Sequence, residues 1–245
     1  MKIFLIAGIA SFCAFSQTAL AATFTLGSLL SGGSLEEGDV AFSNFDFTDN
    51  TPSPAFPGDF IADPDQVDVT TSTAAGSVTL RFDFAPAVII SGIDPGTDLE
   101  HVFDFFIDFD VEVTGGSSRT LTGLTLGEGD LFAEGDASAE VIFFDAETGG
   151  NRLAEIFEDT AFGSQTSDAT SFDDPLSSLS LFGQIEGQTN ANSSTAGLST
   201  FALTFDLDGT PPVTPPVTPV PLPAGLPLIL AGLGSLALLR LSPRA

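Results

Sequence analysis

The chain has 245 residues, and its 33 acidic side chains stand against six basic ones, for a formal net charge of −27 at pH 7. This charge excludes a nucleic-acid binder, because contacts to phosphates need clustered Lys and Arg. All acids lie between Glu36 and Asp208, and residues 22–209 contain three Arg but no Lys, Cys, Tyr or Trp. Many of the side chains used in catalysis and metal binding are therefore missing from this segment.

The chain begins with the three parts of a secretory signal peptide. Lys2 supplies a positive charge, residues 3–15 form an apolar run, and Ala19 and Ala21 provide a small-residue cleavage site. We therefore predict export through the Sec machinery, with residues 1–21 removed after Ala21. An uncleaved anchor is the alternative, but thirteen residues make only about 20 Å of helix against a hydrocarbon layer of roughly 30 Å. Cleavage would leave the mature chain without cysteine and without disulfides.

A short helical turn and then many strands are predicted for residues 22–209. Thr25 is a typical N-cap for a helical turn that Gly32 and Gly33 would stop. Beyond it, apolar and polar residues alternate with the period of two that indicates strands with one solvated side. The alternating segments are 40–47, 66–73, 78–84, 103–113, 120–126, 140–144, 179–185 and 201–207. A phase shift predicts a β-bulge at Ser43 and Asn44, and residues 153–157 fit a helix and a strand equally well.

The spacing of these strands indicates the fold class. Short strands separated by Gly-, Pro- and Asp-rich turns are typical of antiparallel sheets packed face to face, so we predict an all-β sandwich of jelly-roll type. This segment holds 21 of the 24 Phe. A fully buried Phe contributes about 1.5–3 kcal/mol, so Phe burial would stabilise a core that lacks disulfides.

The C-terminal region has a linker and an apolar segment. Residues 210–219 repeat Thr-Pro-Pro-Val, which predicts a polyproline II spacer of roughly 30 Å. Residues 224–239 are mostly apolar and precede Arg240 and Arg244. We therefore predict a single membrane helix with its basic end in the cytoplasm and the acidic domain outside.

Residues 220–245 resemble the PEP-CTERM sorting signals of Gram-negative bacteria, in the VPLPA subtype. The motif is formed by Val220, Pro221, Leu222, Pro223 and Ala224. The resemblance implies recognition and processing by an exosortase, a membrane protease and transpeptidase, and delivery to the cell surface or extracellular matrix. Two Arg separated by three residues depart from the denser basic run of typical tails. A plain tail anchor is the alternative. Residues 26–47 are also similar to ectodomains often joined to such tails.

Catalytic motifs are absent from the sequence of residues 22–209. His101 stands without an accompanying motif, so a structural role is the favoured interpretation. A Gly-x-Ser-x-Gly elbow and a phosphate-binding loop are both missing. A carboxylate pair of the glycosidase kind remains, but 33 acids produce such pairs by chance. We therefore predict no enzyme activity.

Two kinds of ligand are considered for the acidic domain. Calcium prefers oxygen ligands, and its candidates are Asp63, Asp65, Asp68, Asp206 and Asp208, although none has EF-hand or nonapeptide-repeat spacing. Exopolysaccharide is the second, because exosortase systems are associated with it. Trp and Tyr, on which sugar rings commonly stack, are absent, so Phe56 and Phe60 are the candidate substitutes.

The prediction is thus an exosortase-sorted surface or matrix-associated protein with a structural or interaction role. A calcium-assisted exopolysaccharide-binding module is the first alternative, and a carboxylate-based glycoside hydrolase is the second.

Overall fold

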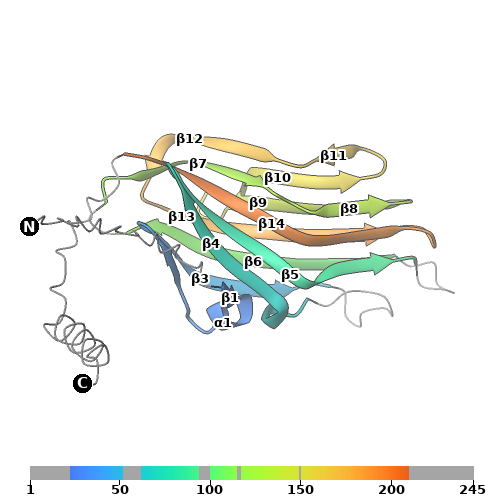
Figure 1. Ribbon diagram of the computed structural model, residues 1–245. Coiled ribbons are helices and arrows are strands. Elements are labelled where there is room, and N and C mark those ends of the chain that lie inside the picture. The colour runs from blue at the N-terminus through green and yellow to red at the C-terminus, as the bar shows by residue number, and fades with distance from the viewer. Residues whose placement is uncertain (1–22, 52–61, 94–99, 115–116, 149, 210–245) are drawn as a thin grey trace, which may run out of the picture. The chain divides into compact units, whose positions relative to one another are not determined.

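The computed structural model describes residues 23–51, 62–93, 100–114, 117–148 and 150–209 (Figure 1). The predicted signal peptide, linker, sorting motif and membrane helix with Arg240 and Arg244 lie outside the described residues, as do the candidate residues Phe56 and Phe60. Within the described ranges, none of the helices is long and apolar enough to cross a membrane.

Two antiparallel sheets of seven strands form a β-sandwich (Figure 1). Sheet A has the order β1 (Thr23–Thr25), β4 (Val67–Ala74), β5 (Ser77–Ser91), β14 (Thr195–Asp208), β7 (Thr120–Gly127) and β12 (Asp168–Leu176), with β8 (Leu131–Glu134) also paired to β14. Sheet B has the order β11 (Gly163–Gln165), β10 (Asn151–Asp159), β9 (Ala137–Asp145), β13 (Ser178–Thr189), β6 (His101–Val113), β3 (Val40–Asp49) and β2 (Leu35–Glu37). The short helices are α1 (Leu26–Leu30) and η1 (Pro64–Gln66).

The strand order is that of a jelly roll. Its eight strands are, in chain order, β5, β6, β7, β9, β10, β12, β13 and β14. The first, eighth, third and sixth of these are neighbours in sheet A, and the fifth, fourth, seventh and second are neighbours in sheet B. This interleaving is the double Greek key, and β4 and β3 each widen one sheet by a strand. The predicted fold class is therefore confirmed, including its jelly-roll type.

Most of the predicted elements are present. Thr25 caps α1 by accepting a hydrogen bond from the Ser28 amide at 3.2 Å. The β3 bulge is also confirmed, because the pairing with β6 shifts between Ser43 and Asp46, and Asn44 has a φ of 55°. Residues 153–157 belong to strand β10, which settles the helix–strand ambiguity. Strands β1, β2, β8, β11 and β12 were not predicted.

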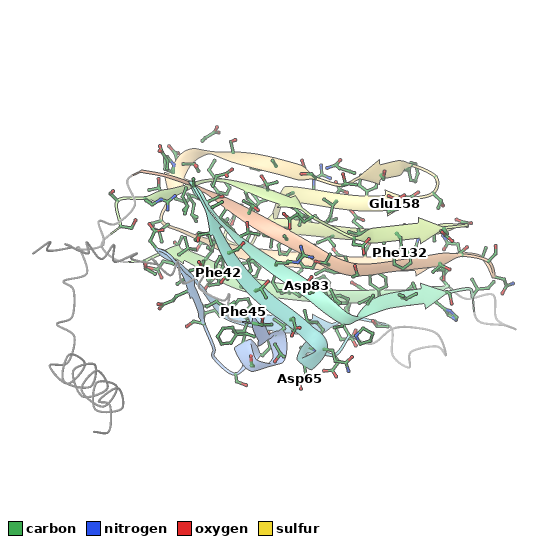
Figure 2. The ribbon with its side chains drawn as sticks, in the orientation of Figure 1. Phe42, Phe45, Asp65, Asp83, Phe132 and Glu158 are labelled. Atoms are coloured by element: carbon green, nitrogen blue, oxygen red, sulfur yellow. The ribbon has the colours of Figure 1, made fainter. Side chains whose placement is uncertain are left out.

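Phenylalanine rings from both sheets fill the core. Almost fully buried rings are those of Phe42, Phe82, Phe103, Phe105, Phe109, Phe143, Phe201 and Phe205. The ring of Phe201 in β14 lies 4.9 Å from that of Phe82 in sheet A and 5.9 Å from that of Phe143 in sheet B. From β3, whose Phe42 and Phe45 are labelled in Figure 2, the Phe42 ring reaches Phe205 of the other sheet at 5.5 Å. These contacts join the two sheets.

Two glycines of β13 make room for this packing. Gly183 lies directly opposite Phe143, and Gly187 lies opposite Phe103. A Cβ at Gly187 would lie 2.4 Å from the Phe103 ring, and one at Gly183 would lie 2.5 Å from the Phe143 ring. The rings therefore lie across the bare backbone of the neighbouring strand, a pairing known to support sheet glycines.

The three Arg of residues 22–209 all form ion pairs. Arg119 binds Asp39 at 3.3 Å with both side chains nearly buried, and Asp39 also accepts a hydrogen bond from Ser117 at 2.6 Å. This pair links the turn before β3 to the segment before β7. Arg81 pairs with Asp83 and Glu128, and Arg152 pairs with Glu155. Most of the acids in the described ranges therefore have no basic partner.

We predict that Phe201→Ala lowers the free energy of unfolding by about 3–5 kcal/mol, because it opens a cavity where the sheets meet. The matched control is Phe162→Ala. The Phe162 ring is 87% exposed, so its removal should change stability by less than about 0.5 kcal/mol. Urea unfolding of both variants measures the difference, and similar losses would contradict this description of the core.

Candidate functional site

The outer face of sheet B carries the candidate site. Residues that alternate with the core positions of β10, β9, β13 and β6 point outward, and the pairing register arranges them in rows across the strands. In the order β10, β9, β13, β6, the rows are Asp159, Ser138, Gln188, Val102; Phe157, Glu140, Glu186, Asp104; Glu155, Ile142, Gln184, Phe106; and Arg152, Phe144, Phe182, Asp108. We call these residues the binding face.

Three half-buried phenylalanines form a ridge on the binding face. The rings of Phe106 and Phe182 stack with their centroids 5.0 Å apart and an interplanar angle of 26°. Phe144 continues the ridge at 6.1 Å from Phe182. These aromatic side chains lie on the solvent side of the sheet and not in the core between the sheets. An apolar patch on an otherwise polar face is typical of a binding surface.

Two adjoining hollows that share Ser138 lie on the same face as the ridge. The first, of about 280 Å³, is lined by Asn50, Val102, Asp104, Ser138, Glu186 and Gln188, with backbone from neighbouring residues. The second, of about 260 Å³, is lined by Glu140, Glu155, Phe157, Asp159 and Phe162, with Ser138 and Ala139. We call the two hollows together the trough. Among the described residues, its lining contains five carboxyl groups and no Lys, Arg or His.

Acidic side chains are direct neighbours along the row that borders the trough. Glu186 of β13 lies opposite Glu140 on one side and Asp104 on the other. Like charges directly opposite in a sheet repel each other. Burial, a hydrogen bond with Glu155 and the charges of Glu155 and Glu186 together raise the pKa of Glu140 to about 8. Burial and the charge of Asp104 also raise the pKa of Glu186. Glu140 therefore keeps its proton at neutral pH.

Asp108 shows the same effect next to the ridge. It lies opposite Phe182 on one side and Asp46 on the other. Burial and the charge of Asp46 raise its pKa to about 6. The three carboxyls with raised pKa values, Glu140, Glu186 and Asp108, thus lie on one face. Perturbed pKa values that cluster in this way are typical of functional sites.

Hydrogen bonds on the binding face leave two acceptors unused. Asp104 accepts a hydrogen bond from Asn50 through Oδ2 at 2.5 Å, and Gln184 donates to Glu186 at 2.8 Å. In contrast, the buried Oδ1 atoms of Asp104 and Asp108 accept no hydrogen bond from the described part of the chain. A buried acceptor without a donor is costly. Both atoms lie beneath the surface of the face, so a ligand does not reach them in this arrangement.

The calcium candidates lie away from the binding face and in two places. Asp63 caps η1, where its carboxylate accepts hydrogen bonds from the Asp65 amide and the Gln66 side chain at 3.0 and 3.1 Å. Asp68 lies in β4, whereas Asp206 and Asp208 lie in β14. Strand β5 separates these two strands in sheet A. In the described ranges, the structure assembles no group of three or more His, Cys, Asp or Glu that could hold a metal ion.

His101 also lies off the binding face. Its side chain is 5% exposed and points inward at the start of β6. Its Nδ1 lies 2.9 Å from the carbonyl oxygen of Ser91, which requires a proton on Nδ1 if this contact is a hydrogen bond. His101 thus connects the end of β5 to β6 and does not line the trough.

Sequence reasoning did not identify the residues of the binding face as a site. The alternating acids of 103–113 were interpreted as a solvated face. The usable signal was an aromatic residue in the polar phase of a strand, as Phe106 is between Asp104 and Asp108. Phe144 and Phe182 also lie outward, next to the inward Phe143 and Leu181. The trough left no local signal, because its residues come from separate strands.

Comparison with known proteins supplies no assignment. Neither protein-family models nor curated proteins match the chain. One similar solved structure is TmCBM61 in complex with β-1,4-galactotriose, at 10% identity over 66% of this chain and 88% of that chain, with a TM-score of 0.25. Another is the enzymatically active domain of tailspike protein 4 from bacteriophage CBA120, at 12% identity over 65% of this chain and 19% of that chain, with a TM-score of 0.23. At such distances neither resemblance indicates a function.

The raised pKa values predict that stability falls as the pH rises. Folded Glu140 holds its proton up to about pH 8, whereas the unfolded chain releases it near the ordinary value of 4.5. Between these values the folded state binds more protons than the unfolded state, so the free energy of unfolding decreases with pH. Asp108 makes the free energy of unfolding decrease in the same way between pH 3.8 and about pH 6.

Thermal melting of the full-length chain from about pH 4 to about pH 8 measures this trend. Glu140→Gln should make the melting temperature depend less on pH in the upper part of this range. Glu36→Gln changes an exposed acid of β2 and should leave the dependence of the melting temperature on pH unaltered. A melting temperature that rises steadily over the whole range would contradict the protonation assigned to Glu140.

Proposed function

We propose that this chain is an exported surface protein whose jelly roll binds an extracellular polysaccharide through the binding face, without cleaving it. The observation that carries the proposal is the ridge of Phe106, Phe144 and Phe182 on the same face as the trough. A sugar ring has an apolar face of C–H groups and a rim of hydroxyls. Aromatic rings next to polar side chains match both parts, as the lining of a small-molecule site usually does.

The extent of the binding face favours a polymer over a single small molecule. Four neighbouring strands, β10, β9, β13 and β6, contribute side chains to it, and strands lie about 4.8 Å apart. The face is therefore roughly 14 Å wide across the strands. The two hollows of the trough adjoin at Ser138. An extended saccharide chain fits such a surface.

The hydrogen bonding of Glu140 favours binding over hydrolysis. A glycosidase needs one carboxyl free to protonate the leaving oxygen and a second that acts as base or nucleophile. Here Glu140 shares a hydrogen bond with Glu155, and Glu155 is also paired with Arg152. The proton is thus engaged between two protein carboxyls and is not directed at a bound sugar.

The proposal gives calcium no part in this binding. The candidates Asp63, Asp65, Asp68, Asp206 and Asp208 belong to η1, β4 and β14, and sheet A, not sheet B, contains both of these strands.

The location of the protein is proposed from its two terminal segments. Export follows from the signal with Ala19 and Ala21, and exosortase sorting from Val220 to Ala224 with Arg240 and Arg244. The bound polysaccharide would then be the exopolysaccharide of the producing Gram-negative bacterium. The strongly acidic domain suits this location, because its net charge keeps it soluble in the matrix.

The first prediction of this proposal concerns the ridge. Full-length chain in mild detergent should bind exopolysaccharide purified from the producing bacterium, and Phe182→Ala should weaken binding by about tenfold through the loss of aromatic contact. The matched control is Phe132→Ala in β8 of sheet A, labelled in Figure 2, which should bind as the unmodified chain does. Calorimetric titration and affinity electrophoresis measure both variants.

Two results would contradict this prediction. Equal binding by the Phe182→Ala and unmodified chains would show that the ridge is not part of the binding site. Release of reducing ends from the polysaccharide, abolished by Glu140→Gln, would show hydrolysis and not binding alone.

The second prediction concerns sorting. Mass spectrometry of the protein from its native host should find no peptide that contains Arg244 and Ala245, because exosortase processing would remove this end of the chain. Replacing Pro221 with Ala should restore that peptide, whereas Pro215→Ala in the linker should not. An intact C-terminus in the unmodified protein would instead indicate a plain tail anchor.

A further inference from the structure

We infer that the binding face takes a glycan with free amino groups, so that its ligand is a cationic amino-sugar polymer. The inference depends on the glycan binding proposed above and specifies the class of glycan. It is carried by the carboxyl groups that line the trough and by the aromatic rings that border it.

The charge of the trough selects among glycans. Carboxyls of Asp104, Glu140, Glu155, Asp159 and Glu186 line it, and no basic residue does so among the described residues. The one cation of the binding face, Arg152, is already paired with Glu155. Sugars that bear carboxylate or sulfate groups would therefore be repelled, and sugars that bear ammonium groups would be attracted.

A cation would stabilise the row of Glu140, Glu186 and Asp104, because their carboxylates repel each other. These three carboxyls follow one another across β9, β13 and β6, at the spacing of neighbouring strands of about 4.8 Å. In the free protein, the proton retained by Glu140 relieves part of the repulsion. A neutral sugar would leave the remaining repulsion in place. An ammonium group placed over the row would interact favourably with more than one carboxyl at once.

The donors of an ammonium group match a row of carboxylates. An ammonium group presents three N–H donors and no acceptor. It can donate to two neighbouring carboxylates of the trough together, which a single hydroxyl proton cannot do.

Aromatic rings border the same space. Phe157 and the 87% exposed Phe162 line the second hollow. Phe106 of the ridge lies one row beyond Glu140, Glu186 and Asp104, and Phe144 and Phe182 lie two rows beyond. The face of an aromatic ring attracts cations as well as the C–H face of a sugar. Phe lacks the hydroxyl of Tyr and the N–H of Trp, so it does not compete for the polar groups of the sugar. A pyranose with an amino group uses both kinds of attraction, whereas a basic peptide uses mainly the charge.

A pair of matched oligosaccharides tests the inference. Full-length chain in mild detergent is titrated, in mildly acidic buffer, with the β-1,4-linked hexamer of glucosamine and with the same hexamer fully N-acetylated. We expect the free-amine hexamer to bind at least about tenfold more tightly, as one charge-assisted contact would produce. Glu186→Gln should weaken binding of the free-amine hexamer severalfold and leave the acetylated one unchanged. Asp206→Asn, which changes an exposed acid of sheet A, is the control and should alter neither.

The possible failures are distinguishable. Equal affinity for the two hexamers would overturn the amino-sugar inference and leave glycan binding intact. A hexalysine peptide that binds as tightly as the glucosamine hexamer, with equal losses in Glu186→Gln and Asp206→Asn, would indicate simple ion exchange and overturn the inference. If neither hexamer nor the host exopolysaccharide binds, both the inference and the proposed function are wrong. Melting curves of the variants, measured in parallel, show that each has folded.

Discussion

Packing of phenylalanine rings between two sheets is the interaction on which the rest of this structure depends. Residues 22–209 have no cysteine and only three Arg against 33 acids, so neither disulfides nor a network of ion pairs can hold the sheets together. Rings such as Phe201 reach across from one sheet to the other, and Gly183 and Gly187 let rings lie over β13. With the core filled in this way, the alternation of each strand sends its acids to the outer faces.

The binding face is a consequence of that arrangement. The register of sheet B places carboxyls directly beside each other, as at Glu140, Glu186 and Asp104. The structure relieves this repulsion by retaining a proton on Glu140 and by hydrogen bonds from Asn50 and Gln184. The same positions border a trough and an aromatic ridge. Neighbouring carboxyls and outward-facing aromatic rings, which are both costly for folding, thus lie on one face. A cationic or hydroxyl-rich ligand bound there would offset that cost.

Local sequence patterns predicted most of the fold, and long-range pairing accounts for what they missed. The period of two in 103–113 predicted β6, and the phase shift near Asn44 predicted the β3 bulge. Strand β12 escaped prediction because Asp173, Asp174 and Pro175 interrupt its alternation. The site escaped for another reason. Asp104, Glu140 and Glu186 become neighbours only when β6, β9 and β13 pair, and no local pattern records that register. Phe106, an aromatic residue in a polar phase, was the one visible sign.

The central claim is that ligand binding occurs on the outer face of sheet B. Its most direct test is the amide NMR spectrum of the isotope-labelled chain during titration with the glucosamine hexamer or the host exopolysaccharide. Shift changes should concentrate on β6, β9 and β13, around Phe106, Glu140 and Glu186, with little change in β4 or β5. Changes concentrated in the strands of sheet A, with β6, β9 and β13 unaffected, would contradict the claim.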